Sequence, residues 1–401
     1  MKKGKKKWIR ARHWVARNVL YCILVPYVKL KYGIKIEPFK EQKGRQFLVV
    51  MNHQTAFDQF ILGAAFKGHV YFVASEDLFS MGFVSKVIKY LVAPIPIKKQ
   101  TTDVGAVRAC IRVAKEGGTI ALAPEGNRTY HGRPVNINPA IAPLVKALKL
   151  PLAIFKIEGG YGVHPRWSDS IRKGYMRAFV SEVIEPEEYK ALSDDELFDR
   201  IKTAMYVDET KVGADYLGSK RAEYLERVMY VCPDCGLTVF ESKENEITCL
   251  KCKKSITHNA DKTLSGVGFE FPFKYVADWY DYQCEFVNGL NLNENPKTLY
   301  FEDNVALFEV ILYKNKNLLS KNAKLSLYGD RMSVCFDGAE LELDFENIKG
   351  ITVLGKNKLN IYFGDKVYQI KGSKRFNALK YVNFCFRYKN LLSENGEFLG
   401  L

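Results

Sequence analysis

The chain has 401 residues, of which 47% are hydrophobic, 60 are Lys or Arg and 45 are Asp or Glu, giving a formal net charge of +15. This length is typical of two or three domains, and the composition excludes a disordered chain, a collagen and a small disulfide-stapled scaffold. The charge is uneven, because residues 1–40 hold 12 basic residues and one acid, a net +11, which leaves +4 for the other 361. A basic segment on a nearly balanced body predicts a local anionic partner.

Residues 1–40 are predicted to form a basic amphipathic segment on a membrane surface. Helical spacing relates Trp8, Ala11, Val15, Val19 and Cys22, and an apolar run covers residues 19–28. Ten residues are too few to cross the hydrocarbon layer, which needs about 20. The start mimics a signal peptide, but no small-residue cleavage site follows it. We therefore predict an interfacial or shallowly inserted helix pair on the cytoplasmic face of an anionic cell membrane; the alternative is a soluble amphipathic helix. The charge of this segment includes five leading lysines, Lys2, Lys3, Lys5, Lys6 and Lys7.

Residues 41–227 alternate between strand-like and helix-like segments. Apolar runs typical of buried strands cover residues 47–51, 70–74, 92–97, 119–123, 152–157 and 176–184. Helical patterns lie near residues 57–66, 76–91, 104–116 and 139–149, and residues 185–227 are charged and helix-prone. This alternation predicts an α/β domain with a partly parallel sheet flanked by helices.

The first strand is followed by a histidine and a carboxylate. His53 lies at the carboxyl end of the strand, where α/β sheets usually bind ligands, and Asp58 follows five residues later at the start of a helix. A turn between them can bring the carboxylate to Nδ1 of the imidazole, which leaves Nε2 as a general base. The alternative is a surface histidine next to a helix-capping aspartate.

A second polar cluster follows the strand at residues 119–123. Glu125, Gly126 and Arg128 come directly after Pro124. The planar guanidinium of Arg128 can clamp a phosphate, and Glu125 can accept a substrate hydroxyl or orient Arg128. Gly126 lets backbone N–H groups approach an anion closely.

These residues carry a resemblance. Asn52-His53, Asp58 and the later Pro124-Glu125-Gly126-Asn127-Arg128-Thr129 resemble two motifs of the glycerophospholipid acyltransferases, above all the 1-acylglycerol-3-phosphate acyltransferases of PlsC type. Residues 94–99 and 150–153 resemble two further blocks, and the resemblance spans about residues 15–190. The middle block ends in Lys98-Lys99 where the family usually has arginine, so bidentate contact is lost there. Ala123 and Asn127 also depart from the usual Phe and Thr.

The resemblance implies an O-acyltransferase that moves an acyl chain from acyl-CoA or acyl carrier protein to the free hydroxyl of a lysophospholipid, with no catalytic cofactor. The favoured acceptor is lysophosphatidic acid. The alternatives are another lysophospholipid or an ether lipid, or a non-catalytic lipid-binding scaffold. The implied catalytic residues are His53, Asp58 and Glu125, and the implied substrate-binding residues are Asn52, Lys98, Lys99, Gly126, Asn127 and Arg128.

Four of the nine cysteines form two Cys-x2-Cys pairs, Cys232 with Cys235 and Cys249 with Cys252. Four thiolates at this spacing resemble a zinc ribbon and make a closed, structural Zn²⁺ site. A redox dithiol is the alternative. The mixture of lysines and acids around the pairs gives no basic stripe, so nucleic-acid binding is not expected. This ribbon is predicted to cover residues 228–260.

Residues 261–401 are predicted to form a β-rich module. One aromatic helix at 271–287 precedes seven short strands between 299 and 370 and a closing helix at 373–390. The aromatic stripe at 269–282 is expected to serve core or inter-domain packing. This order of elements resembles a pleckstrin-homology or GRAM module. Of the five histidines outside the motifs, His13 and His69 are expected to be solvated, and His131 is a candidate for the rim of the acyltransferase pocket.

Overall fold

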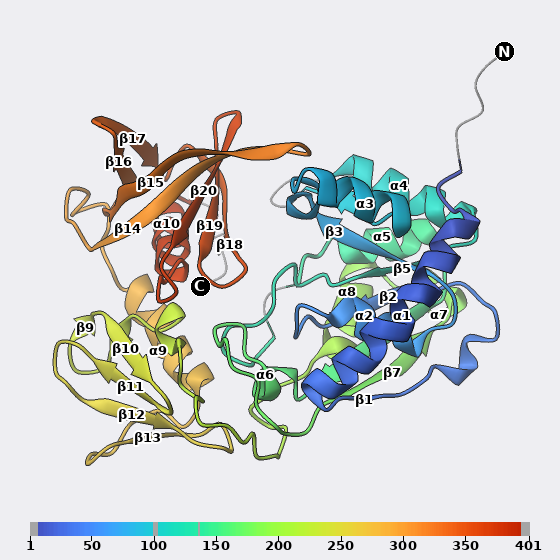
Figure 1. The fold of residues 1–401 in the computed structure, drawn as a ribbon, viewed down its shortest axis with the longest axis horizontal. Helices are drawn as coiled ribbons and strands as arrows, with labels where there is room; N and C mark the ends of the chain where they lie inside the picture. Colours follow the sequence, from blue (N-terminus) through green and yellow to red (C-terminus); the bar gives the residue numbers. More distant parts are fainter. Residues whose placement is uncertain (1–6, 99–102, 135–136, 394–401) are drawn as a thin grey trace. The chain divides into compact units, whose positions relative to one another are not determined.

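The computed structural model describes residues 7–98, 103–134 and 137–393. The chain divides into two compact units (Figure 1). The first comprises Met1–Pro165 and Ile171–Tyr216, and the second comprises Arg166–Ser170 and Leu217–Leu401. Lys99 and the lysines at positions 2, 3, 5 and 6 lie outside the described residues.

The first unit is built on a seven-stranded sheet in the order β1-β7-β6-β2-β5-β3-β4. The five strands from β6 to β4 run parallel, whereas β7 is antiparallel to β6 and β1 is parallel to β7. The strands are β1 (Lys35–Ile36), β2 (Leu48–Met51), β3 (Val70–Ser75), β4 (Ile95–Ile97), β5 (Thr119–Leu122), β6 (Leu152–Glu158) and β7 (Arg177–Ile184). The predicted α/β class and its partly parallel sheet are confirmed.

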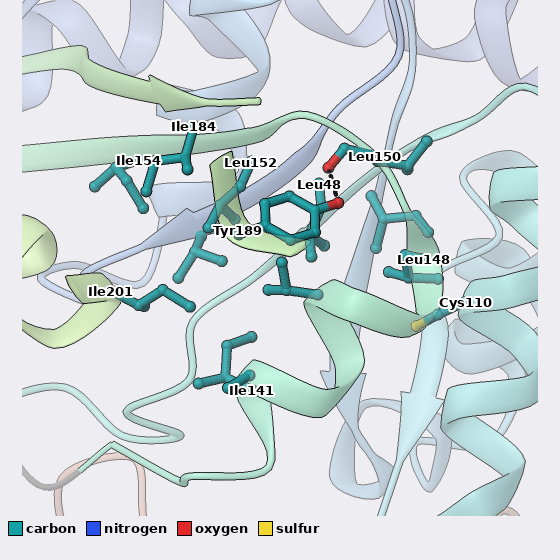
Figure 2. Close-up of a cluster of buried hydrophobic side chains, with 14 of the residues drawn as sticks. Leu48, Cys110, Ile141, Leu148, Leu150, Leu152, Ile154, Ile184, Tyr189 and Ile201 are labelled. Carbon is teal, nitrogen blue, oxygen red and sulfur yellow. Dashed lines mark hydrogen bonds between the residues drawn. The ribbon is translucent and has the colours of Figure 1, made fainter. Parts of the chain in front are cut away.

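Helices cover both faces of this sheet because its central strands are apolar on both sides. Leu48 and Val50 of β2 point into one core and Val49 and Met51 into the other. Figure 2 shows the first core, in which the Tyr189 hydroxyl donates to the carbonyl oxygen of Leu150 over 2.9 Å. The helices are α1 (Ala11–Tyr32), α2 (Asp58–Ala65), α3 (Phe83–Leu91), α4 (Val104–Lys115), α5 (Ile141–Leu148), α6 (Gly160–Val163), α7 (Pro186–Lys190) and α8 (Asp194–Met205).

Two predicted helices differ from the observed ones. The stretch at 76–91 is divided into a 3₁₀ turn, Glu76–Phe79, and α3, because Gly82 adopts a φ of +61° between them. The predicted N-terminal helix pair is wrong. Instead α1 is a single helix of 22 residues that continues through Pro26 and ends at Gly33 in the left-handed conformation.

The second unit begins with a short 3₁₀ turn, Leu225–Arg227, and the cysteine-bearing region. Strands β8 (Val231–Cys232) and β9 (Gly236–Leu237) pair, and β10 (Phe240–Lys243), β11 (Glu246–Cys249), β12 (Ser255–His258) and β13 (Leu264–Gly266) form an antiparallel meander. Helix α9 (Val276–Asn288) begins five residues later than predicted, because Tyr275 forms a β-bridge with Thr263.

A seven-stranded antiparallel sheet follows in the order β17-β16-β15-β14-β20-β19-β18, and α10 (Leu379–Leu392) comes after it. Its strands are β14 (Phe301–Ile311), β15 (Asn315–Leu327), β16 (Arg331–Phe336), β17 (Ala339–Asp344), β18 (Ile348–Leu354), β19 (Lys358–Phe363) and β20 (Lys366–Gly372). The predicted β-rich region with a closing helix is confirmed. Trp279 of α9 is buried against Phe240 of β10, whereas Phe271 and Phe273 of the same aromatic stripe are half-buried.

Candidate active site and cysteine cluster

The loop between β2 and α2 brings His53 and Asp58 together. The Asp58 Oδ2 atom lies 2.6 Å from Nδ1 of His53, and its carboxylate is buried while the imidazole is about one-third exposed. The same carboxylate accepts the backbone N–H groups of Gln54 and Thr55, at 2.7 and 2.8 Å, and the Thr55 hydroxyl at 2.6 Å. These bonds fix the carboxylate, so that it can hold the imidazole with Nε2 free to accept a proton.

Glu125 joins this loop to the one that follows β5. The backbone N–H of His53 donates to Glu125 Oε2 over 3.3 Å, across 72 residues of sequence. The two loops meet because β2 and β5 are parallel neighbours, so their carboxyl ends lie at the same edge of the sheet. The predicted pair of motifs is therefore brought together at one place.

The carboxyl group of Glu125 has an unusually high pKa at this edge of the sheet. Burial, opposed by the hydrogen bond from the His53 N–H and assisted by the charge of Asp58, raises the pKa of Glu125 to about 8. At neutral pH Glu125 therefore holds a proton and can donate a hydrogen bond. Burial lowers the pKa of Arg128, and the charge of Asp58 opposes this change, so a cation stands near the His53–Asp58 pair.

The other predicted substrate-binding residues are distributed around this edge. Gly126 has a φ of +66° and open space where a Cβ would stand, which keeps the turn accessible to an anion. The backbone N–H of Asn127 donates to the carbonyl of Glu125, and that of Lys98, just after β4, donates to Asp103. The Asn52 amide exchanges two hydrogen bonds of 2.8 Å with the backbone of Ile157, so it ties β2 to β6 and is already used in the fold.

Sequence reasoning missed Tyr32 and Thr55. Tyr32, the last residue of α1, is buried with its hydroxyl 3.4 Å from His164 Nδ1 and its ring beside that of Phe57. Burial and then the charge of Asp58 raise the pKa of Tyr32 to about 12, so α1 ends near the Asp58 carboxylate. No local signal marks Tyr32, because this proximity depends on how α1 packs. Thr55 was visible inside the first motif, but its role depends on the loop geometry.

The predictions for His13 and His69 are wrong, since the two rings pack together instead of being solvated. His13 is buried with Nδ1 3.1 Å from the Tyr71 hydroxyl, and His69 Nε2 lies 2.9 Å from the carbonyl of Val92. Burial lowers the pKa of both rings, that of His13 to about 4. His131 is also buried, and its Nδ1 accepts the N–H of Arg133 in the loop after β5.

The four paired cysteines converge in the second unit. The sulfur atoms of Cys232, Cys235, Cys249 and Cys252 all lie within 4.8 Å of one another, and those of Cys232 and Cys252 are 3.9 Å apart. A tetrahedral Zn²⁺ with Zn–S bonds of 2.3 Å needs sulfurs about 3.8 Å apart. The cluster therefore fits a four-thiolate metal site.

One face of α1 exposes apolar side chains. Val15, Val19, Ile23 and Leu30 are 54%, 61%, 69% and 87% exposed, whereas Val28 and Tyr32 of the same helix are buried in the core. Helix α3 packs against α1 and also exposes Phe83, Val84 and Tyr90. A search of the described residues finds no helix that is both long and apolar enough to cross a membrane.

The chain is similar in sequence to known acyltransferases. Residues 34–156, which contain both motifs, match the model of the acyltransferase family. Over 184 residues, 45% of this chain and 85% of the relative, the chain is 23% identical to a 1-acyl-sn-glycerol-3-phosphate acyltransferase of Bacillus subtilis strain 168. Among solved structures, the 1-acyl-sn-glycerophosphate acyltransferase PlsC of Thermotoga maritima matches 49% of this chain and 78% of its own, with 23% identity and a TM-score of 0.41.

Proposed function

We propose that this O-acyltransferase, which carries a PlsC-type acyltransferase domain, transfers an acyl chain from acyl-CoA or acyl carrier protein to lysophosphatidic acid and so forms phosphatidic acid. The observation that carries the proposal is the 2.6 Å contact between His53 Nδ1 and Asp58 Oδ2, next to Glu125 at the carboxyl edge of the sheet. The relative from Bacillus subtilis, which is 23% identical and is named a 1-acyl-sn-glycerol-3-phosphate acyltransferase, supports this acceptor.

In the proposed reaction His53 Nε2 removes the proton from the free hydroxyl of the acceptor. The alkoxide oxygen bonds to the thioester carbonyl carbon, and the carbon–sulfur bond then breaks. The leaving thiolate takes the proton back from the imidazolium, so no covalent acyl-enzyme forms. Asp58 stabilises the imidazolium, and a general base of this kind contributes about 10²–10⁴-fold to the rate.

The acceptor phosphate is proposed to bind at the turn after β5. The cation of Arg128 and the open turn at Gly126 offer charge and backbone N–H groups to it. Protonated Glu125 can donate a hydrogen bond to the phosphate or to the acceptor oxygen. Lys98 and Asn127 are proposed to contribute at a greater distance. Lys98 follows β4, which is separated from β5 by β3 in the sheet. Asn52 supports the site by holding β2 to β6.

The enzyme is proposed to work on the cytoplasmic face of an anionic membrane. Its acceptor is a lipid, the N-terminal segment is strongly basic, and α1 exposes a row of apolar side chains. We also propose that the four-cysteine cluster holds a structural Zn²⁺, since four thiolates leave no open position for a substrate.

A lipid-product assay tests the acceptor and the donor together. Purified protein is given lysophosphatidic acid or other lysophospholipids and ether lipids, each with acyl-CoA and with acyl carrier protein, and the products are identified by mass spectrometry. We expect phosphatidic acid as the main product and its loss in His53→Ala. If another acceptor is turned over faster, that acceptor is the preferred substrate instead of lysophosphatidic acid. If no acyl transfer is detected with any acceptor, the protein is a non-catalytic lipid-binding scaffold.

A further inference from the structure

A cavity of about 230 Å³ opens at the start of α1, in the first unit. Pockets of about 300–1,000 Å³ hold drug-sized ligands, so this one suits a smaller group. Of the described residues that line it, five are basic and none is acidic. The lining residues are Lys7, Trp8, Arg10, Arg12, His13, Lys89, Ala93 and Arg112.

Local contacts hold the walls of this cavity in place. Trp8 Nε1 donates to the carbonyl of Ala93, and Arg12 Nε donates to the carbonyl of Tyr90 while its guanidinium stacks on the Tyr90 ring at 4.0 Å. Arg112 pairs with Glu116 over 3.0 Å, and Glu116 also accepts the backbone N–H of Ile9. One carboxylate beside five cations leaves a strong excess of positive charge in a small volume.

The cavity also receives the start of a long helix. Among the described residues no side chain caps α1, and no acidic residue lies in its first turn, so its positive end is not neutralised. His13 lines the cavity and is buried, and the described part of the chain supplies no hydrogen-bond partner for its Nε2. When Nδ1 accepts from the Tyr71 hydroxyl, Nε2 carries the ring proton and can donate it to an anion.

The location separates this cavity from the catalytic centre and points to a lipid ligand. His13 and Tyr32 are 19 residues apart on α1, about 28 Å along its axis, and Tyr32 is the residue near Asp58. Exposed Val15 follows the cavity residues along α1, and the exposed apolar face of the helix continues from it. A headgroup in the cavity could therefore have its acyl chains beside this face.

We propose that this cavity is a second, non-catalytic site that binds the phosphate of an anionic membrane lipid through Lys7, Arg10 and the other basic side chains of its wall. Arginine and lysine side chains with a helix N-terminus are the usual protein ligands of a phosphate. The site fixes the start of α1 at the membrane surface. The inference does not rest on acyl transfer and stands or fails separately from it.

A matched pair of variants tests the site in the full chain. Lys7→Gln/Arg10→Gln removes two exposed cations of the cavity, and Lys29→Gln/Lys35→Gln removes two exposed cations from the other end of the same region. Binding to phosphatidylcholine vesicles that contain phosphatidylglycerol is measured by flotation. We expect the cavity variant to lose roughly tenfold in affinity and the control only a few-fold. If both variants lose the same affinity for the vesicles, or if neither loses any, the proposed site is rejected. The binding would then come from attraction spread over the whole basic segment.

A soluble ligand distinguishes the source of the phosphate. The ring signals of His13 are followed by NMR in the full-length protein during titration with dihexanoyl phosphatidylglycerol or with inorganic phosphate. We expect a saturable shift with the short lipid alone, which Lys7→Gln/Arg10→Gln abolishes. A shift with both ligands supports a phosphate site that free phosphate also fills, and a shift with neither rejects the proposal.

Discussion

Four donors converge on the carboxylate of Asp58, and this makes the residue hard to replace. His53 Nδ1 and the N–H of Gln54 bond to Oδ2, while the N–H and hydroxyl of Thr55 bond to Oδ1. Asparagine has one accepting oxygen and a donating nitrogen, so it cannot satisfy all four. The imidazole would then lose both its orientation and the charge that stabilises its protonated form.

We therefore predict that His53→Ala and Asp58→Asn each lower kcat by about 10²–10⁴-fold. The measurement is the initial rate of acyl transfer at saturating donor and acceptor. Thr55→Ser keeps the hydroxyl that bonds to Asp58 and is the matched control, expected to stay within a few-fold of wild type. Circular dichroism and vesicle binding should be unchanged in all three. Near-normal rates in His53→Ala would remove this histidine from the mechanism.

Glu125 gives a separate prediction about pH. Its pKa is raised from 4.5 to about 8, so between these values the folded protein keeps a proton that the unfolded chain has released. Its contribution to stability is therefore complete below about pH 4.5 and falls as the pH rises toward 8. Glu125→Gln keeps a neutral, hydrogen-bonding side chain without this titration.

We expect the melting temperature of wild type to fall relative to Glu125→Gln by a few degrees between pH 5 and 8. Activity of wild type should also decline above about pH 8, because ionised Glu125 places a second negative charge near Asp58 and repels the acceptor phosphate. Melting curves and pH profiles of kcat/KM check both points. If the melting temperatures of wild type and Glu125→Gln change in parallel across this pH range, Glu125 ionises normally.

At the scale of the element, α1 contributes one face to the core and another to solvent. Because Val28 is buried in the core, deletion of residues 1–30 would damage the fold as well as any membrane contact. Substitutions on the exposed face separate the two effects. Val19 and Ile23 are both mostly exposed and are one turn apart, so serine at these positions leaves the core intact.

We predict that Val19→Ser/Ile23→Ser releases the protein from vesicles, because burying an apolar side chain in the membrane contributes about 1.5–3 kcal/mol. Leu217→Ser/Val239→Ser changes two equally exposed apolar residues of the second unit and should have little effect. High salt should release little wild-type protein, since it screens charge attraction but not apolar insertion. Flotation measures all of these. Equal binding by both double variants would mean that α1 is not the anchor.

At the scale of the whole molecule, the chain forms two compact units, and among the described residues the cysteine cluster lies in the second. We predict about one zinc per chain by elemental analysis. Chelation should unfold the cysteine region before the acyltransferase unit, because binding a structural zinc contributes directly to folding.

The cysteines offer a matched pair for this prediction. Cys235→Ser removes a ligand and should lower both the zinc content and the first of two melting transitions. Cys335→Ser changes an exposed cysteine outside the cluster and should leave both unchanged. Metal-free protein with the same two transitions would show that the cluster is stable without zinc.

The sequence alone determined the features that depend on short separations. Strand runs such as 47–51, the His53–Asp58 spacing and the two Cys-x2-Cys pairs are set by the geometry of neighbouring residues, and each is found where it was predicted. The order of elements in the C-terminal region was also predictable, because its turn residues and alternating strands are local signals.

Only the tertiary structure decided which distant segments meet. The contact of His53 with Glu125 and the bonds of Asn52 to Ile157 follow from the order of strands in the sheet. The burial of His13 and the place of Tyr32 beside Asp58 follow from the face on which α1 packs, and Pro26 alone did not reveal that α1 is one helix. Such contacts depend on which apolar faces bury one another, and many pairings of faces are compatible with the same local pattern.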